Sequence, residues 1–124
     1  MLVAEKTTEL IIGAAVKVHR ELGPGLLESV YEVCLAHEIA KSGLKVQKQI
    51  DVPIRYDDCE LDCGFRIDLL IDDEVIVELK AVEKVLPVHE AQLMTYLKLA
   101  NKRVGLLINF NVVKLTNGIT RRVI

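Results

Sequence analysis

The chain has 124 residues, and 51% of them are hydrophobic, so it can bury a core and we expect one domain over residues 1–124. It carries 16 basic and 18 acidic residues, a formal net charge of −2, and its isoelectric point is near 5.9. This balance excludes a strongly basic protein that coats nucleic acid, so any nucleic-acid role needs a local patch or a partner. No apolar run approaches the ~20 residues that cross a bilayer, and we expect no membrane partner.

Two apolar patterns in the first third of the chain predict helices over about 7–21 and 27–42. Apolar side chains recur in the first at the three-to-four spacing of a half-buried helix: Leu10, Ile11, Ala14, Ala15 and Val18. The "GPG" at 23–25 ends this helix, because proline cannot continue it and glycine tolerates the turn. Gly43 is the expected end of the second helix.

From Leu44 the hydrophobic period changes to two, which predicts an antiparallel strand with one solvated face over about 44–56. The "DD" at 57–58 marks a turn. Two further strands are expected over about 64–71 and 75–82, joined by a second turn.

A third helix is predicted from Pro87, where proline is tolerated at an early helical position. The almost wholly apolar segment 103–110 predicts a central strand. The "NG" at Asn117-Gly118 predicts a hairpin between 112–115 and 119–124.

This order of elements predicts an α/β (α+β) fold, with a mixed central β-sheet flanked by helices. The apolar segment 108–115 either closes the sheet or forms a dimer edge, and the pattern does not separate the two.

The three cysteines, Cys34, Cys59 and Cys63, form an odd set without a CxxC motif. An odd count is typical of a reducing compartment, and the N-terminus has acidic residues and no long apolar block, unlike a signal peptide. We therefore expect a cytoplasmic protein. Zinc binding by Cys59 and Cys63 is an alternative, but there is no second pair, so we interpret them as small strand residues.

The expected strand pair contains charged residues that a buried strand tolerates only when they are paired: Asp68, Glu78 and Lys80. A two-residue turn would send Asp68 and Glu78 to opposite faces. A three-residue turn over 72–74 sets Asp68 opposite Glu78, with Lys80 one step along the same face. We predict the three-residue turn, because it places the remaining apolar residues in one dry layer and because aspartate tolerates the left-handed conformation.

Two adjacent carboxylates repel and stay ionised only when a cation lies between them. Oxygen ligands at this spacing suit Mg²⁺, which takes one or two carboxylates, and a nearby lysine can orient an attacking water. This combination fits hydrolysis of a phosphodiester. The alternative is that Glu78 and Lys80 form a solvated pair on an edge strand, since the Asp-x9-Glu-x-Lys spacing also arises by chance.

Two further motifs accompany these charges. "GLLESVY" places Gly25, Glu28 and Tyr31 in the spacing GxxExxY, and "QLMTY" places Gln92 and Tyr96 on one helical face. In this order the motifs resemble those of the RecB-like branch of the PD-(D/E)XK nuclease superfamily. From about residue 9 to the C-terminus the chain resembles the small prokaryotic GxxExxY protein family.

The resemblance implies a metal site. Asp68 and Glu78 would bind Mg²⁺, with Mn²⁺ as a possible substitute, and the carbonyl of Leu79 would help. Glu28 would add a carboxylate from its helix, directly or through water. Without the resemblance, Glu28 is explained by the favourable position of a carboxylate at a helix N-terminus.

The resemblance also implies catalytic roles. Lys80 would position the attacking water, and Gln92 and Tyr96 would orient active-site side chains or contact substrate phosphate. Ile67 stands before Asp68 where the motif name has proline, a position that varies in the superfamily. Tyr31 is interpreted as a core residue.

These features predict a Mg²⁺-dependent nuclease that hydrolyses nucleic acid, with DNA favoured. The alternative is a non-catalytic metal-binding or protein-interaction module of a nucleic-acid-processing complex, which the acidic balance and small size favour. A small-molecule phosphodiesterase is a third possibility. A protein partner or a homodimer is compatible with each of them.

Overall fold

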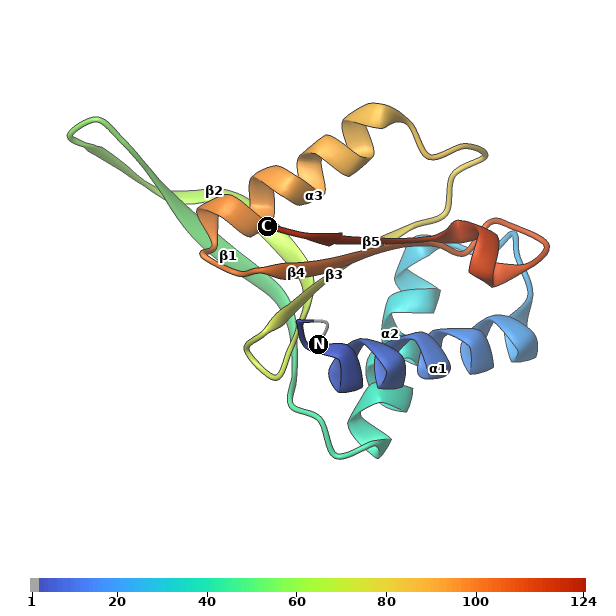
Figure 1. The fold of residues 1–124 in the computed structure, drawn as a ribbon. Helices are drawn as coiled ribbons and strands as arrows, with labels where there is room; N and C mark the ends of the chain where they lie inside the picture. The colour runs from blue at the N-terminus through green and yellow to red at the C-terminus, as the bar shows by residue number, and fades with distance from the viewer. Residues whose placement is uncertain (1–2) are drawn as a thin grey trace.

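The computed structural model describes residues 3–124, apart from the side chain of Cys63. In chain order the elements are α1 (Glu5–Leu22), α2 (Glu28–Lys41), β1 (Val46–Tyr56), β2 (Cys59–Ile71), β3 (Val75–Lys80), α3 (Pro87–Leu99), β4 (Val104–Asn109), the 3₁₀-helix η1 (Leu115–Gly118) and β5 (Ile119–Val123) (Figure 1). None of the described helices is long and apolar enough to span a membrane.

The strands form a five-stranded sheet in the order β1-β2-β3-β4-β5. The β3–β4 pair is parallel and the other pairs are antiparallel, so the mixed sheet predicted from the sequence is confirmed. Helices α1 and α2 cover one face and α3 covers the other (Figure 1). Every residue of β4 is buried, as expected for an interior strand.

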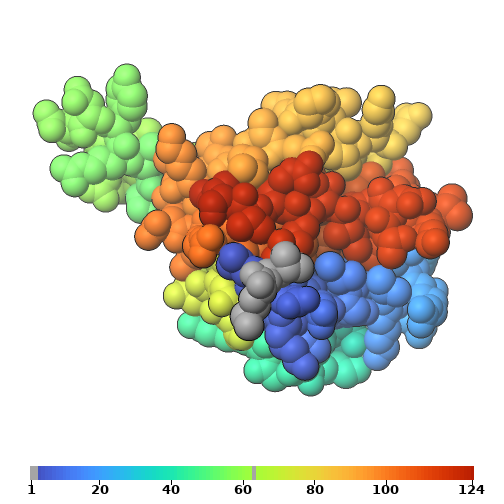
Figure 2. Space-filling view, in the orientation of Figure 1, coloured from blue at the N-terminus to red at the C-terminus, as the bar shows by residue number. Residues whose placement is uncertain are grey.

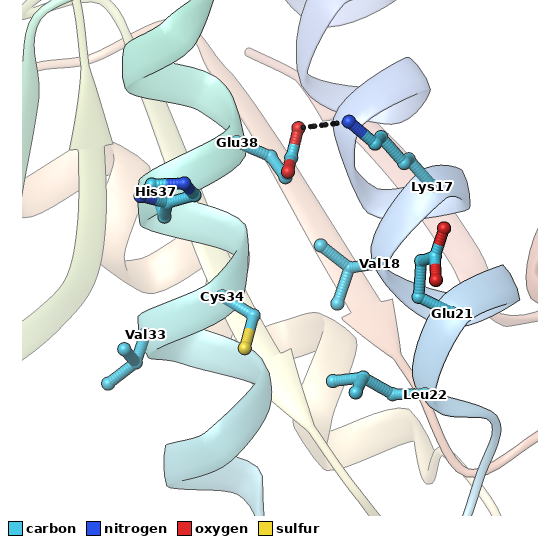
Figure 3. A pocket seen from close by; sticks show the side chains of 8 residues that line it. All are labelled: Lys17, Val18, Glu21, Leu22, Val33, Cys34, His37 and Glu38. Carbon is cyan, nitrogen blue, oxygen red and sulfur yellow. Dashed lines mark ion pairs between the residues drawn. The ribbon is translucent and has the colours of Figure 1, made fainter.

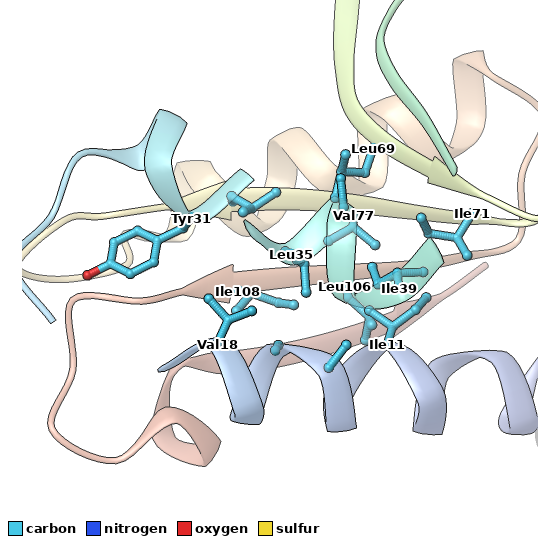
Figure 4. Close-up of a cluster of buried hydrophobic side chains, with 14 of the residues drawn as sticks. Ile11, Val18, Tyr31, Leu35, Ile39, Leu69, Ile71, Val77, Leu106 and Ile108 are labelled. Atoms are coloured by element: carbon cyan, nitrogen blue, oxygen red, sulfur yellow. The ribbon is translucent and has the colours of Figure 1, made fainter. Parts of the chain in front are cut away.

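Two apolar clusters, one on each face of the sheet, form the core. The larger cluster joins α1 and α2 to the strands, and Figure 4 shows its side chains converging from Ile11, Val18, Tyr31, Leu35, Ile39, Leu69, Ile71, Val77, Leu106 and Ile108. The smaller cluster lies under α3: Ile67, Leu70, Ile76, Leu93, Leu97 and Leu107. Burial of these aliphatic side chains is the main favourable contribution to folding.

The turn between β2 and β3 has the predicted three residues, because Ile71 pairs with Val75. Asp72 and Asp73 adopt positive φ angles of 52° and 54°, the left-handed conformation on which the prediction relied. The same register pairs Leu69 with Val77, so the next residues, Asp68 and Glu78, come opposite each other.

Strand β3 ends at Lys80, two residues earlier than expected. The side chain of Asn109 replaces a strand partner at this point, because its amide donates to the carbonyl of Val82 at 2.9 Å and its oxygen accepts the Val82 N–H at 3.1 Å. A buried amide thus closes the ladder and directs the chain into the loop before α3.

The hairpin predicted at Asn117-Gly118 is wrong. Residues 112–115 form no strand, residues 115–118 form η1, and β5 pairs with β4 instead. The physical reason is tertiary: Leu115 is buried in the larger cluster, and Gly118 is so close to the backbone that a Cβ there would lie 2.2 Å from the carbonyl oxygen of Asn109. Strand β5, rather than segment 108–115, closes the sheet.

The distal part of the β1–β2 hairpin projects beyond the helices, as Figures 1 and 2 show. We call residues 53–64 the arm. Its register shifts between Val52 and Ile54, which marks an irregularity where the hairpin leaves the body. Cys59 and Cys63 lie in β2, as predicted for strand residues, although the side chain of Cys63 is outside the described part of the chain.

Candidate active site

Strands β2 and β3 separate at Asp68. The last paired residues are Leu69 and Val77, and beyond them the Asp68 carboxylate takes over the role of a backbone partner. Its Oδ2 accepts the N–H of Leu79 at 2.9 Å, and the Asp68 N–H lies 3.5 Å from Glu78 Oε1. The structure therefore brings these two acids together at a gap in the sheet.

Glu78 is 5% exposed. Burial, reinforced by the hydrogen bond and the negative charge of Asp68, raises the pKa of the Glu78 carboxyl from 4.5 to about 9, against the opposing influence of Lys80. The metal-free protein therefore keeps Glu78 protonated at neutral pH. Two carboxylates that cannot both ionise without a cation are the arrangement predicted from the sequence.

Tyr31 positions the start of α2. Its hydroxyl donates to the carbonyl of Gly23 at 2.6 Å and accepts the N–H of Leu26 at 3.1 Å, and its ring stacks on Phe110 at 4.5 Å. Gly25 has a φ of +97°, which side chains rarely adopt. The tyrosine and glycine of the GxxExxY spacing thus shape the loop before α2, and Tyr31 is a core residue as predicted.

Glu28 is the first residue of α2 and faces the same pocket as Asp68. Partial burial and then the charge of Asp68 raise the pKa of the Glu28 carboxyl, while Lys80 lowers it. The pocket has a volume of about 280 Å³ and is lined by Glu28, Ser29, Glu32, Gln49, Asp68 and Leu79. Glu28, Asp68 and Lys80 are therefore electrostatically coupled.

The sequence interpretation missed three residues of this pocket, Ser29, Glu32 and Gln49. The register places Gln49 between the pairs of β1 and β2 that flank Asp68, and its φ of +51° is unusual for a strand residue. The Gln49 side-chain amide hydrogen-bonds to Glu32 and lies 3.5 Å from Asp68 Oδ1. The four-residue spacing from Glu28 to Glu32 was a usable signal, whereas no local pattern singles out Gln49.

Tyr96 approaches the acids from the α3 face of the sheet. Its ring stacks on Phe65 at 4.3 Å, and burial followed by the charges of Glu78 and Asp68 raises the pKa of its hydroxyl. Gln92 lies one turn earlier on α3 and is half-buried. Its side chain makes no hydrogen bond to another residue of 3–124, so the structure relates Tyr96, rather than Gln92, to the acids.

The predicted ligands form a two-carboxylate arrangement. Within residues 3–124 no group of three or more His, Cys, Asp or Glu side chains is placed to hold a metal ion, so Glu28 does not complete a closed set with Asp68 and Glu78. Mg²⁺ commonly takes only one or two carboxylates and keeps several waters. Asp68 and the buried Glu78 are adjacent carboxyl groups, so the residues present fit such an ion, whose positive charge would allow both to ionise.

A second pocket, between α1 and α2, has a different chemistry. It has a volume of about 300 Å³, and Figure 3 shows Val18, Leu22, Val33 and Cys34 around it, with Lys17 and Glu38 paired at its rim at 3.2 Å. None of the acids of the β2–β3 gap lines this pocket. The acids predicted to bind a metal thus lie at the gap in the sheet rather than in this pocket.

Comparison with known proteins gives one match. A family model described as the PD-(D/E)XK nuclease superfamily matches residues 5–123, which is nearly the whole chain. No curated protein matches the sequence. No solved structure matches it either.

Proposed function

Because the chain belongs to the PD-(D/E)XK nuclease superfamily, we propose that it is a Mg²⁺-dependent nuclease whose metal would be held by Asp68 and Glu78. The superfamily supports a nuclease-like function and, with it, a nucleic-acid substrate. We further assign the chain to the GxxExxY family within the RecB-like branch, on the motifs around Glu28 and Gln92. Residues 1–124 then form one nuclease domain that works in the cytoplasm.

One observation carries this proposal: Asp68 and Glu78 meet where β2 and β3 separate, and Lys80 lowers the pKa of the Glu78 carboxyl from the same strand. A divalent ion held there supplies Lewis-acid stabilisation of a phosphoryl group and a more acidic water nucleophile. The Leu79 N–H fixes the orientation of the Asp68 carboxylate.

The remaining residues of the site orient the attacking water and the substrate and stabilise charge on the phosphate. The Lys80 ammonium donates hydrogen bonds and carries positive charge, so it orients the attacking water and stabilises charge that develops on the phosphate. Glu28 accepts a hydrogen bond from water on the α2 side. Tyr96, whose hydroxyl stays protonated at neutral pH, donates from the α3 side, and Gln92 contacts the substrate one turn earlier on the helix.

The test separates metal binding from cleavage. We would titrate Mg²⁺ and Mn²⁺ by calorimetry and assay plasmid DNA, single-stranded DNA, RNA and a small phosphodiester. We expect Asp68→Ala to lose both metal binding and cleavage. We expect Lys80→Met to keep metal binding and lose about 10²–10³-fold in cleavage rate, the range for loss of a donor that stabilises charge in the transition state.

Lys84→Met is the matched control, because it removes the same charge from an exposed loop residue four positions away and should leave cleavage unchanged. The proposal would be contradicted if the wild type cleaved DNA and Lys80→Met cleaved it at the same rate. If only the small phosphodiester were cleaved, the substrate would be a small molecule rather than nucleic acid.

The net charge of −2 favours a second candidate, a metal-binding module whose partner supplies the affinity for nucleic acid. Its signature is Mg²⁺ binding that Asp68→Ala abolishes, without cleavage of any substrate tested. A protein partner with a basic surface would then be needed to bring the module to nucleic acid.

A further inference from the structure

The arm concentrates negative charge away from the site. It carries four acidic side chains, Asp57, Asp58, Glu60 and Asp62, against one basic side chain, Arg55. All five are exposed, and within residues 3–124 none of them forms an ion pair. This charge repels a polyanion, so the arm is unsuited to contact nucleic acid.

The arm also exposes apolar side chains on one face. Ile54 pairs with Leu61, and Tyr56 pairs with Cys59, so these four side chains lie on the same face of the ribbon. Tyr56 is 77% exposed and Leu61 is 54% exposed. A projecting ribbon with a bare apolar face and an acidic tip is typical of a segment that docks on another protein.

The opposite end of the molecule carries a groove of complementary character. It lies between α1 and the segment around η1, has a volume of about 340 Å³ and is lined by Val16, His19, Arg20, Val113, Lys114, Leu115 and Thr116. No acidic residue lines it, and neither Arg20 nor Lys114 has an ion-pair partner among the described residues. Val113 is 95% exposed at its edge. We call this the basic groove.

We propose that two copies of this chain associate by docking the arm of each copy into the basic groove of the other. The apolar face of the arm would contact Val16 and Val113, and the acids at its tip would pair with Arg20 and Lys114. Arm and groove lie at opposite ends of the molecule (Figures 1 and 2), so two antiparallel copies make both contacts at once. Such an interface is closed and two-fold symmetric, which stops growth at the dimer.

Docking through the face of the arm is favoured over pairing of sheet edges. Strand β1 is a sheet edge, but Pro53 lacks an N–H and Gln49 has a left-handed backbone, so this edge offers an interrupted row of partners. The apolar pocket of Figure 3 is a poorer receptor, because Glu21 lines it and its one lysine, Lys17, is already paired with Glu38.

Charge exchange between two variants of the full chain tests the proposal. Asp57→Lys/Asp58→Lys reverses the tip of the arm, and Arg20→Glu/Lys114→Glu reverses the basic groove. Analytical ultracentrifugation across micromolar to millimolar concentrations should show dimers of the wild type. Each double variant alone should dimerise at least about tenfold more weakly, since like charges then meet at both contacts.

Mixing the two double variants is the decisive step. The lysine tip meets the glutamate groove, and the aspartate tip of the second variant meets the arginine and lysine of the first, so a heterodimer should form with nearly wild-type affinity. Thermal melting of each variant shows that it is folded. Rescue on mixing also excludes a folding defect as the cause of the weakened association.

Lys48→Glu is the matched control, because Lys48 lines a different apolar pocket, with Val33 and Val46. It should dimerise like the wild type and should fail to rescue the lysine-tip variant. The proposal would be overturned by double variants that dimerise normally or by a mixture that stays monomeric. It would also be overturned by a wild type that stays monomeric, which would point to a different basic protein as the partner of the arm. These outcomes are independent of the nuclease assay.

Discussion

The acidic residues in the arm and at the base of the β1–β2 hairpin lie in different environments. In the arm, Asp58 and Glu60 are exposed and have no ion-pair partner among the described residues. At the base of the same strand, Asp68 accepts a backbone N–H, and burial together with the neighbouring Asp68 raises the pKa of Glu78 to about 9. The residue types are the same, so burial beneath the helices is what distinguishes the Glu78 carboxyl from the carboxyls of the arm.

The difference has a structural origin. Around Asp68 the sheet is covered on one face by α2 and on the other by α3, and the gap between β2 and β3 leaves polar groups without ladder partners. The arm extends past both helices, so water solvates its side chains.

The largest difference, in Mg²⁺ affinity, is expected between Asp68→Asn and Asp58→Asn. The first removes the charge that a divalent ion needs, and we expect the Mg²⁺ affinity to fall by at least about 100-fold. The second removes the same charge from the arm and should leave the affinity unchanged. Calorimetric titration measures both, and equal effects of the two substitutions would show that the base of the hairpin is not the metal site.

Glu78→Gln and Glu60→Gln are expected to differ in how stability depends on pH. In EDTA the folded wild type retains a proton on Glu78 that the unfolded chain releases above about pH 4.5, so the folded state binds more protons between about pH 4.5 and 9. Its free energy of unfolding therefore falls as the pH rises through this window. Glu78→Gln should remove this fall and be more stable than the wild type at about pH 8.

Urea denaturation at about pH 5 and pH 8 measures this effect. Glu60→Gln should keep the wild-type pH dependence, because Glu60 is exposed. A Glu78→Gln variant with the wild-type slope would show that Glu78 ionises normally in the folded protein.

Tyr31→Phe should lower the free energy of unfolding more than Tyr56→Phe does. Loss of the Tyr31 hydroxyl leaves the Gly23 carbonyl and the Leu26 N–H without their partner, and we expect a loss of about 1–3 kcal/mol in the free energy of unfolding. Because this loop sets the start of α2, cleavage should weaken as Glu28 is displaced. Tyr56 is exposed in the arm, so the free energy of unfolding of Tyr56→Phe should lie within about 0.5 kcal/mol of the wild-type value. Urea denaturation measures both variants.

The smallest effect is expected for Gln49→Ala compared with Lys48→Ala. Gln49 donates to Glu32 and lies within reach of Asp68, so its loss lets two carboxylates repel and should weaken Mg²⁺ binding by about tenfold. Lys48 is exposed on the adjacent position and should have little effect. Calorimetry separates them, and unchanged Mg²⁺ affinity in Gln49→Ala would limit this side chain to a structural role.

Local patterns predicted most of the elements in the chain. The helices around "GPG", the first strand and the helix from Pro87 lie close to their expected bounds, because hydrophobic period and proline position depend on a few neighbouring residues. Strand β2 begins at Cys59 rather than near residue 64. The hairpin at Asn117-Gly118 was wrong because burial of Leu115 and the close approach of Gly118 to Asn109 outweighed the turn preference of the dipeptide.

By itself the sequence determined that Asp68 and Glu78 share a face, because strand parity and a three-residue turn follow from local chain geometry. Only the tertiary structure decided that β2 separates from β3 at this point and that Gln49 and Glu32 join the pocket. It also brings Tyr96 close enough for the charges of Glu78 and Asp68 to raise the pKa of its hydroxyl. These outcomes depend on how helices pack against the two faces of the sheet. Such packing joins residues far apart in the chain, so no short pattern encodes it.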